Sequence, residues 1–213
     1  MNFRLRLIRG IGLCFLLLGL AGCIQLTKSF PEKQFYSLEV SRQGAASSPA
    51  PGTVLRVRRF LTAPQFDNRG LVYRTGELQY ESDFYHEWFV SPKALVTEQM
   101  QNWLAASGLF EHVLDPASAL EETHAIEGAI TGLYGDYRDP TAPKAILEIR
   151  VRLTRETASR SRIVLDQDYR QAITVPNESP GALVKAWNEE LQQVLTELEA
   201  DLRRSGAFAE SHK

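Results

Sequence analysis

Cys23 is the residue whose type and position most directly suggest chemistry in this sequence. It stands where the apolar run LLLGL has ended and a polar segment begins, and the one other cysteine of the chain is Cys14. A cysteine thiol can pack in a core, form a disulfide, act as a nucleophile or accept a covalent group. The residues that precede Cys23 distinguish between these four roles.

Residues 1–22 have the three-part pattern of an export signal. The segment MNFRLRLIRG supplies a positive flank, IGLCFLLLGL an apolar core, and Ala21-Gly22 the small residues of a cleavage region. The apolar run has about 12 residues, whereas a permanent membrane-spanning helix needs roughly 20. We therefore expect a signal peptide that is removed, in preference to a transmembrane anchor.

Leu20-Ala21-Gly22-Cys23 resembles the lipobox of bacterial lipoproteins, in which an aliphatic residue and two small residues precede an obligatory cysteine. The small pair fits an extended chain into a narrow protease site, and the Cys23 thiolate can take a diacylglyceryl group as a stable thioether. Cleavage between Gly22 and Cys23 frees an amine that can also be acylated. Two or three acyl chains, at about 0.8 kcal/mol per buried methylene, suffice for lasting anchorage. We predict lipidation of Cys23, with residues 23–33 as a lipidated tether.

The same pattern excludes a disulfide and suggests a location. Cys14 is discarded with the signal, so the mature chain has no second thiol for a bond within a monomer. The residue after Cys23 is Ile24, whereas lipoproteins kept in the inner membrane usually resemble one another in carrying Asp there. By that analogy, we expect the protein at the periplasmic face of the outer membrane.

Charge argues against nucleic acid as a partner. The 213 residues include 24 Lys and Arg against 26 Asp and Glu. Without Arg4, Arg6 and Arg9 of the signal, 21 basic side chains remain against 26 acidic ones. Affinity for a phosphate backbone rests on clustered Lys and Arg, which this balance does not supply.

The other reactive side chains form no recognisable catalytic or metal-binding pattern. The sequence has no nucleophile elbow, phosphate loop or dinucleotide-binding glycines. Its four histidines lack the spacing of metal ligands; these histidines are His86, His112, His124 and His212. Asp83, His86 and Glu87 lie close together in DFYHEW, but we expect them to point in different directions at a surface or edge. We predict no metal, no cofactor and no enzymatic activity.

Periodicity predicts an α+β fold, with a mixed, largely antiparallel sheet and two main helices packed on one face. Helices are expected after the caps Ser91-Pro92 and Ser179-Pro180, with ends at Gly108 and Gly206. Strands are expected over 34–40, 53–60, 70–74, 77–80, 109–114, 124–138, 145–156 and 163–175, with a flexible loop over 41–52 and a bend or bulge at the glycines of 124–138. We expect one domain over residues 34–206 and a flexible tail over 207–213.

Three tryptophans and a basic run leave alternatives open. Trp103 and Trp187 lie on apolar helical stripes and are expected in the core. Trp88 lies among polar residues just before a helix, as either a core anchor or an interface residue. The run Arg56, Arg58 and Arg59 is either a solvated strand face or a contact for phospholipid head groups or an acidic partner.

Several segments, in order, resemble the ABC-type transport auxiliary lipoprotein family. They are LAGC, FYSL, FDNRGLVYR, LQY, Trp88 with Ser91-Pro92, LAASGLFEHVL, LYGDYRD with AILEIRVRLTRE, and the closing Ala/Leu-rich helix. The resemblance covers nearly the whole mature chain. The chain departs from the family in Phe89-Val90 after the tryptophan and in a longer region around DFYHE.

The resemblance implies a periplasmic lipoprotein without catalytic residues, bound to outer-membrane phospholipid through its acyl chains. Its partners would be an MCE-domain protein and an inner-membrane ABC transporter or permease. It would dock a trans-periplasmic lipid conduit, and the resemblance also implies assembly into a homo-oligomeric ring. By motif, the positions implied in partner binding are Asp67, Asn68, Arg69, Tyr73, Arg74 and Trp88. Two other functions stay open: a stand-alone lipid-binding carrier, which needs an apolar cavity, and an anchored envelope hydrolase that depends on His86.

Overall fold

The computed structural model describes residues 31–157 and 159–206. The predicted signal peptide, the cleavage bond after Gly22, Cys23, most of the predicted tether and the predicted tail 207–213 lie outside these residues.

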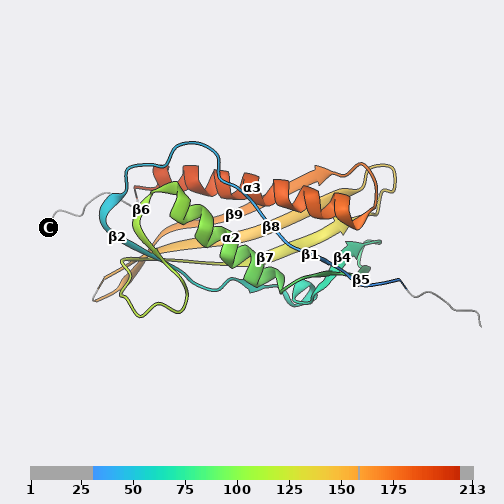
Figure 1. The fold of residues 1–213 in the computed structure, drawn as a ribbon, viewed down its shortest axis with the longest axis horizontal. Helices are drawn as coiled ribbons and strands as arrows, with labels where there is room; N and C mark the ends of the chain where they lie inside the picture. Colours follow the sequence, from blue (N-terminus) through green and yellow to red (C-terminus); the bar gives the residue numbers. More distant parts are fainter. Residues whose placement is uncertain (1–30, 158, 207–213) are drawn as a thin grey trace, which may run out of the picture. The chain divides into compact units, whose positions relative to one another are not determined.

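Strands and helices follow one another in the mixed order that the sequence predicted (Figure 1). The elements are β1 (Gln34–Tyr36), β2 (Ala50–Val57), β3 (Leu61–Thr62), the 3-10 helix η1 (Pro64–Phe66), β4 (Gly70–Arg74), β5 (Tyr80–Trp88), α2 (Pro92–Ser107), β6 (Phe110–Leu114), β7 (His124–Asp136), β8 (Lys144–Glu156), β9 (Ser161–Thr174) and α3 (Pro180–Arg204). The predicted α+β class is confirmed.

Strand β7 is the centre of the sheet. Along one edge it pairs antiparallel with β8, which in turn pairs antiparallel with β9. Along its other edge it pairs in succession with three short parallel strands, β2, β3 and β4. Strand β6 extends the sheet beyond β2, and β5 and β1 extend it beyond β4. The sheet is mixed, and most of its paired residues belong to the two long antiparallel pairings.

Both helices pack on the same face of this sheet, as predicted, with α2 beside α3 (Figure 1). Helix α3 covers β8 and β9, and α2 covers β6, β2 and β3. The main core lies between the helices and the sheet and includes Trp103 and Trp187, whose predicted burial is confirmed. The indole N–H of Trp187 donates a 3.2 Å hydrogen bond to the Ile146 carbonyl, which satisfies its polar atom inside the core.

The glycines of β7 produce the irregularity that the sequence predicted. The register with β8 shifts between Ile130 and Gly132. A Cβ atom on Gly128 would overlap the ring of Phe60 and the Arg150 carbonyl oxygen. Phe60 itself is fully buried. Glycine is therefore required where this aromatic ring crosses β7.

Three strand predictions were wrong in their limits. The strand expected over 53–60 runs instead from Ala50 to Val57, so residues 50–52 of the expected loop belong to β2. The strand expected over 34–40 ends at Tyr36. The last two residues of that range bond helix side chains instead of a strand: Glu39 N–H donates to Asn188 Oδ1 at 2.6 Å, and Val40 N–H to Gln99 Oε1 at 3.1 Å. The strand expected over 77–80 instead starts at Tyr80 and continues to Trp88. Here the pairing with β4 and β1 overrides a weak local alternation.

The segment expected as a flexible loop over 41–52 makes specific contacts with both helices. Arg42 donates two hydrogen bonds of 2.9 Å to the Glu199 carboxylate on α3, and the Trp103 indole N–H of α2 donates to Glu199 as well. Burial alone would raise the pKa of Glu199, but the hydrogen bonds from Arg42, Arg203 and Trp103 outweigh it and lower this pKa to about 2. The carboxylate therefore stays ionised and joins the segment to α2 and α3.

Glu190 is a second buried carboxyl group on α3, and the charge of Arg170, which favours its ionisation, does not outweigh its burial. Its Oε1 accepts a 2.8 Å hydrogen bond from Ile173 N–H, while Oε2 has no hydrogen-bond partner among the described residues. Burial raises the pKa of Glu190 to about 8. The folded protein therefore keeps this group protonated at pH values where the unfolded chain, with an ordinary Glu, is ionised.

We predict that Glu190→Gln makes the stability of the protein less sensitive to alkaline pH. Because the folded-state pKa is raised, the group's contribution is fully present below about pH 4.5 and is lost as pH rises through about 8. At pH 9 the variant should be more stable than the parent by about 5 kcal/mol, because a pKa raised by about 3.5 costs about 1.4 kcal/mol per pH unit, with little difference at pH 4. Urea unfolding at both pH values measures this. An equal loss of stability in parent and variant between the two pH values would contradict it.

Candidate functional site

The turn between η1 and β4 carries Asp67, Asn68 and Arg69, three of the residues implied in partner binding, and all three are exposed. The Asp67 carboxylate lies 2.9 Å from Lys93 Nζ in the first turn of α2. Asn68 Oδ1 accepts a 3.2 Å hydrogen bond from Ser82 Oγ of β5. The turn is therefore connected to both α2 and β5.

Gly70 permits this close approach. A Cβ atom here would overlap Ser82 Oγ and the Asp83 carbonyl oxygen. The register between β4 and β5 also shifts between Gly70 and Val72. A glycine at the start of β4 is thus needed to place the exposed turn against β5.

Arg69 and Trp88 are joined by two hydrogen bonds. Trp88 N–H donates to the Arg69 carbonyl at 2.6 Å, and Arg69 Nε donates to the Trp88 carbonyl at 2.9 Å. The Trp88 side chain is 1% exposed, and its ring centroid lies 5.3 Å from that of Trp187. Of the two roles expected for Trp88, the structure gives it that of a core residue, which fixes the end of β5 beneath the exposed Arg69.

Tyr73, Asp83 and His86 form a cluster that the sequence analysis did not predict. Asp83 Oδ2 accepts a 2.8 Å hydrogen bond from Tyr73 Oη and lies 2.8 Å from His86 Nδ1. Asp83 Oδ1 accepts from the backbone N–H groups of Tyr85 and His86. The expectation that Asp83 and His86 point in different directions was wrong, because these backbone bonds bend β5 locally and bring the two side chains together.

The hydrogen bonds fix the ionisation of this cluster. Burial opposes the charge on Asp83, but the bonds from Tyr73, Tyr85 and His86 outweigh it and lower the pKa of Asp83 below its ordinary value. Burial and the bond to Asp83 raise the pKa of Tyr73 well above its ordinary value. Asp83 is thus an ionised acceptor with its lone pairs in use, and no hydroxyl of the described residues hydrogen-bonds the His86 ring as a nucleophile would.

The other end of β4 carries Arg74 and leads into the β4–β5 hairpin. Arg74 Nη2 donates a 2.6 Å hydrogen bond to the Glu77 carbonyl, and its guanidinium carbon lies 5.6 Å from the centroid of Tyr80. At the tip of the hairpin, Leu78 is 93% exposed. The residues implied in partner binding therefore occupy two places: Tyr73 and Arg74 near this hairpin, and Asp67, Asn68, Arg69 and Trp88 at the opposite end of β4.

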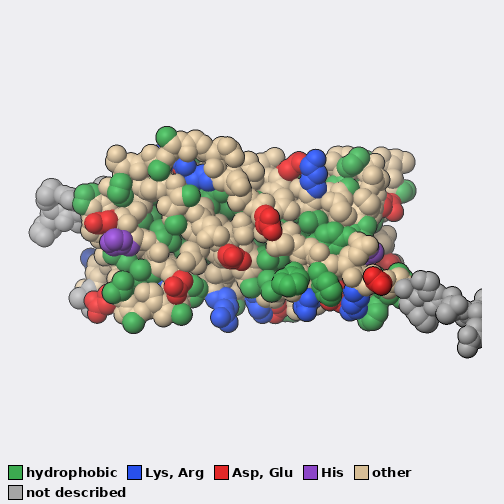
Figure 2. Space-filling model, viewed as in Figure 1, with side chains coloured by type: hydrophobic (Ala, Val, Ile, Leu, Met, Phe, Trp, Pro, Cys, Tyr) green, Lys and Arg blue, Asp and Glu red, His purple; other side chains and the backbone are tan. Residues whose placement is uncertain are grey.

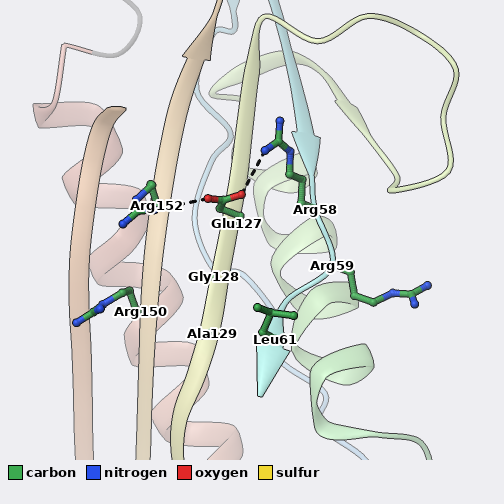
Figure 3. A pocket seen from close by; sticks show the side chains of 8 residues that line it. All are labelled: Arg58, Arg59, Leu61, Glu127, Gly128, Ala129, Arg150 and Arg152. Atoms are coloured by element: carbon green, nitrogen blue, oxygen red, sulfur yellow. Dashed lines mark hydrogen bonds and ion pairs between the residues drawn. The ribbon is translucent and has the colours of Figure 1, made fainter. Parts of the chain in front are cut away.

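Two of the three arginines in the basic run at the end of β2 are paired with acids. Arg56 bonds Glu122 at 2.8 Å, and Arg58 lies 3.2 Å from Glu127 and 3.5 Å from Glu156. This pairing favours the structural interpretation of Arg56 and Arg58 over contact with head groups. Arg59 points away from Glu127 (Figure 3).

A surface hollow of about 370 Å³ lies beside this run (Figure 3). Four arginines and one glutamate contribute to its wall; its lining residues are Arg58, Arg59, Leu61, Glu127, Gly128, Ala129, Arg150 and Arg152. A stand-alone lipid carrier needs an enclosed apolar cavity for acyl chains. This charged, open hollow does not provide one.

The sequence analysis did not single out three exposed phenylalanines, Phe35, Phe84 and Phe89. Phe35 belongs to β1, Phe84 to β5, and Phe89 follows β5 directly. Figure 2 shows hydrophobic side chains next to Lys and Arg in the region where Figure 1 places β1, β4 and β5. The sequence held one indication of the exposure of Phe35. In the alternation of residues 34–40, Phe35 falls on the same face as Ser37 and Glu39, where a polar residue is expected.

Two features of the described residues bear on the class of site. They contain no group of three or more His, Cys, Asp and Glu side chains placed to hold a metal ion. None of their helices has both the length and the hydropathy needed to cross a bilayer.

The sequence match to known families decides the identity of the domain. Residues 36–199 match the family described as the ABC-type transport auxiliary lipoprotein component. This match spans most of the chain and all elements from the end of β1 into α3. The chain belongs to this family. As a member of the ABC-type transport auxiliary lipoprotein family, it is a lipoprotein component associated with an ABC transport system.

Solved structures share the fold of this auxiliary lipoprotein. A protein from Xanthomonas campestris is similar with a TM-score of 0.71 at 17% identity, over 81% of this chain and 96% of that one. An uncharacterised protein is similar with a TM-score of 0.63 at 14% identity, over 80% and 99% of the two chains. No curated protein matches the sequence significantly.

We predict that Tyr73→Phe destabilises the auxiliary lipoprotein by about 1–2 kcal/mol, because it removes a hydrogen bond to an ionised carboxylate. The variant keeps the ring that stacks on Tyr137 at 5.2 Å, so the loss reports on the hydroxyl alone. Urea unfolding at pH 7 measures the effect. Tyr85→Phe is the matched control, because the Tyr85 hydroxyl bonds no described residue. Equal stability of the two variants would contradict the role given to the Tyr73–Asp83 bond.

Proposed function

We propose that this protein is a lipid-anchored auxiliary subunit that docks a trans-periplasmic lipid conduit at the outer membrane. The observation that carries the proposal is the family match over residues 36–199, which follows a lipobox at Leu20–Cys23. In this proposal Cys23 carries the acyl chains after cleavage behind Gly22, residues 23–33 act as the tether, and the domain of residues 34–206 binds the conduit. The conduit partner is an MCE-domain protein that works with an inner-membrane ABC transporter or permease.

The geometry supports a binding role without catalysis. The ionised Asp83 accepts four hydrogen bonds that shape β5, so an acid–base role would require it to leave a structural network. The Arg-lined hollow is open to solvent and is not the enclosed cavity that a lipid carrier needs. Neither observation favours the hydrolase or the stand-alone carrier over the docking subunit.

The exposed ends of β4 are the surface we propose for the conduit. The turn offers the Asp67 carboxylate and the Asn68 amide, and the hairpin offers Leu78, whose side chain is almost fully exposed. Both segments are held in position by neighbouring residues. The turn is bonded to the core residue Trp88, and in the hairpin Arg74 lies over the Tyr80 ring. Fixed, exposed side chains of mixed character are the composition expected of a specific protein contact. Assembly of identical copies into a ring belongs to the same proposal.

The test is affinity purification of the lipidated protein from native membranes in mild detergent, followed by mass spectrometry. We expect an MCE-domain subunit in the purified material. Leu78→Asp should reduce its recovery at least several-fold, while Leu120→Asp, at another exposed leucine on the 115–123 loop, should leave it unchanged. Absence of any MCE-domain subunit in several detergents, or equal loss in both variants, would count against the proposal.

A further inference from the structure

Three exposed phenylalanines are gathered at one place on the domain. Phe35 is 49% exposed, Phe84 66% and Phe89 65%, and the ring centroids of Phe35 and Phe89 are 6.3 Å apart in an edge-to-face arrangement. Single exposed apolar residues are normal on a protein surface, whereas a contiguous group marks an interaction site.

Two cations lie against these rings. Lys33 Nζ is 4.2 Å from the centroid of Phe84, and the guanidinium carbon of Arg69 is 5.4 Å from that of Phe35. Both also face Glu87: Lys33 forms an ion pair with it, and Arg69 Nε lies 4.0 Å from its carboxylate. We name Lys33, Phe35, Arg69, Phe84, Glu87 and Phe89 the aromatic–basic patch. Two cations and one acid lie among these six residues, although the mature chain as a whole is acidic.

The core fixes the position of this patch. Phe35 lies opposite Glu87 in the parallel pairing of β1 with β5, and the adjacent pair is Tyr36 with Trp88. Trp88 is buried against Trp187 of α3. Because successive residues of a strand face opposite sides, the burial of Trp88 turns Glu87 and Phe35 outward.

The length of the tether limits what can cover the patch. Lys33, a patch residue, is ten positions after Cys23, and a chain of that length spans at most about 35 Å when fully extended. Attachment of Cys23 to a bilayer would therefore hold the patch close to the membrane surface and raise its effective concentration there. Phenylalanine with Lys and Arg is also the composition of protein surfaces that enter the boundary between head groups and acyl chains.

We propose that the aromatic–basic patch binds the surface of the bilayer that anchors Cys23. Phe35, Phe84 and Phe89 enter the head-group region, while Lys33 and Arg69 face lipid phosphates. This inference rests on the lipidation in the proposed function. It adds a second, non-covalent contact that orients the domain relative to the membrane.

The experiment places spin labels on the full-length lipidated protein. A cysteine introduced into the mature chain is the one free thiol, because Cys23 is acylated and Cys14 leaves with the signal. Phe84→Cys, Phe89→Cys and the control Leu120→Cys are labelled separately and reconstituted into vesicles of phosphatidylethanolamine and phosphatidylglycerol. All three side chains are exposed, so the substitutions leave the core intact. Power-saturation spectroscopy then measures collision with oxygen and with a water-soluble nickel complex.

We expect labels at 84 and 89 to be several-fold less accessible to the nickel complex than the label at 120, and more accessible to oxygen. Equal accessibility of all three labels to the nickel complex would overturn the inference. Labels at 84 and 89 that are shielded from both reagents and broadened by a neighbouring spin would also overturn it, since a second copy would then cover the patch.

The same samples separate the two proposals. Protein that fails to float with the vesicles lacks the lipid anchor, which overturns the inference together with the anchoring part of the proposed function. Labels in the head-group region with no MCE-domain subunit in the affinity purification would overturn the docking function and support the membrane contact.

Discussion

The two different edges of β7 are the constraint on which the rest of the structure depends. One edge is used along its whole length by β8, and the other is shared among β2, β3 and β4, which arrive at successive positions. Each short strand hydrogen-bonds to a different stretch of β7, whose backbone N–H and C=O groups on that edge would otherwise be unpaired. Strands β1 and β5, which carry the aromatic–basic patch, connect to β7 only through β4. The strands that carry the aromatic–basic patch are therefore joined to the central strand β7 through the short pairing of β4 alone.

Regular local patterns were sufficient to predict the long elements. In residues 145–153 every second side chain is apolar, and Ala145, Leu147 and Ile149 are indeed buried. Gly108, predicted to end a helix, has the left-handed φ of 66° that glycine adopts readily. The stripe of α3, with Leu183 and Leu191 among its members, is fully buried. In these segments local preference and tertiary packing agree.

The misplaced elements depend on partners that are distant in the sequence. Beyond β1, the backbone N–H groups of Glu39 and Val40 donate to side chains of the two helices, Asn188 and Gln99, instead of continuing the strand. The length of β5 comes from its pairing with β4 and β1, since residues 80–88 contain charges and aromatics without clear alternation. The parallel order of β2, β3 and β4 along β7 has no local signature, because register between distant strands is set by the whole sheet.

The candidate site was predictable only in part for the same reason. A family resemblance selected Asp67, Asn68, Arg69, Tyr73, Arg74 and Trp88, but only the structure separates the buried Trp88 from the exposed turn above it. The Asp83–His86 contact depends on a local bend of β5, which alternation rules do not anticipate. Phe35, Phe84 and Phe89 each look like ordinary strand residues in the sequence. Their meeting on one surface follows from β1 pairing with β5.

The account as a whole requires a folded domain held at a bilayer through one residue. Intact-mass spectrometry of the protein purified from native membranes tests this most directly. We predict a chain that begins at Cys23, with added mass equal to a diacylglyceryl group and, where the new amine is also modified, one further acyl chain. An unmodified Cys23, or a chain that still carries residues 1–22, would contradict the account.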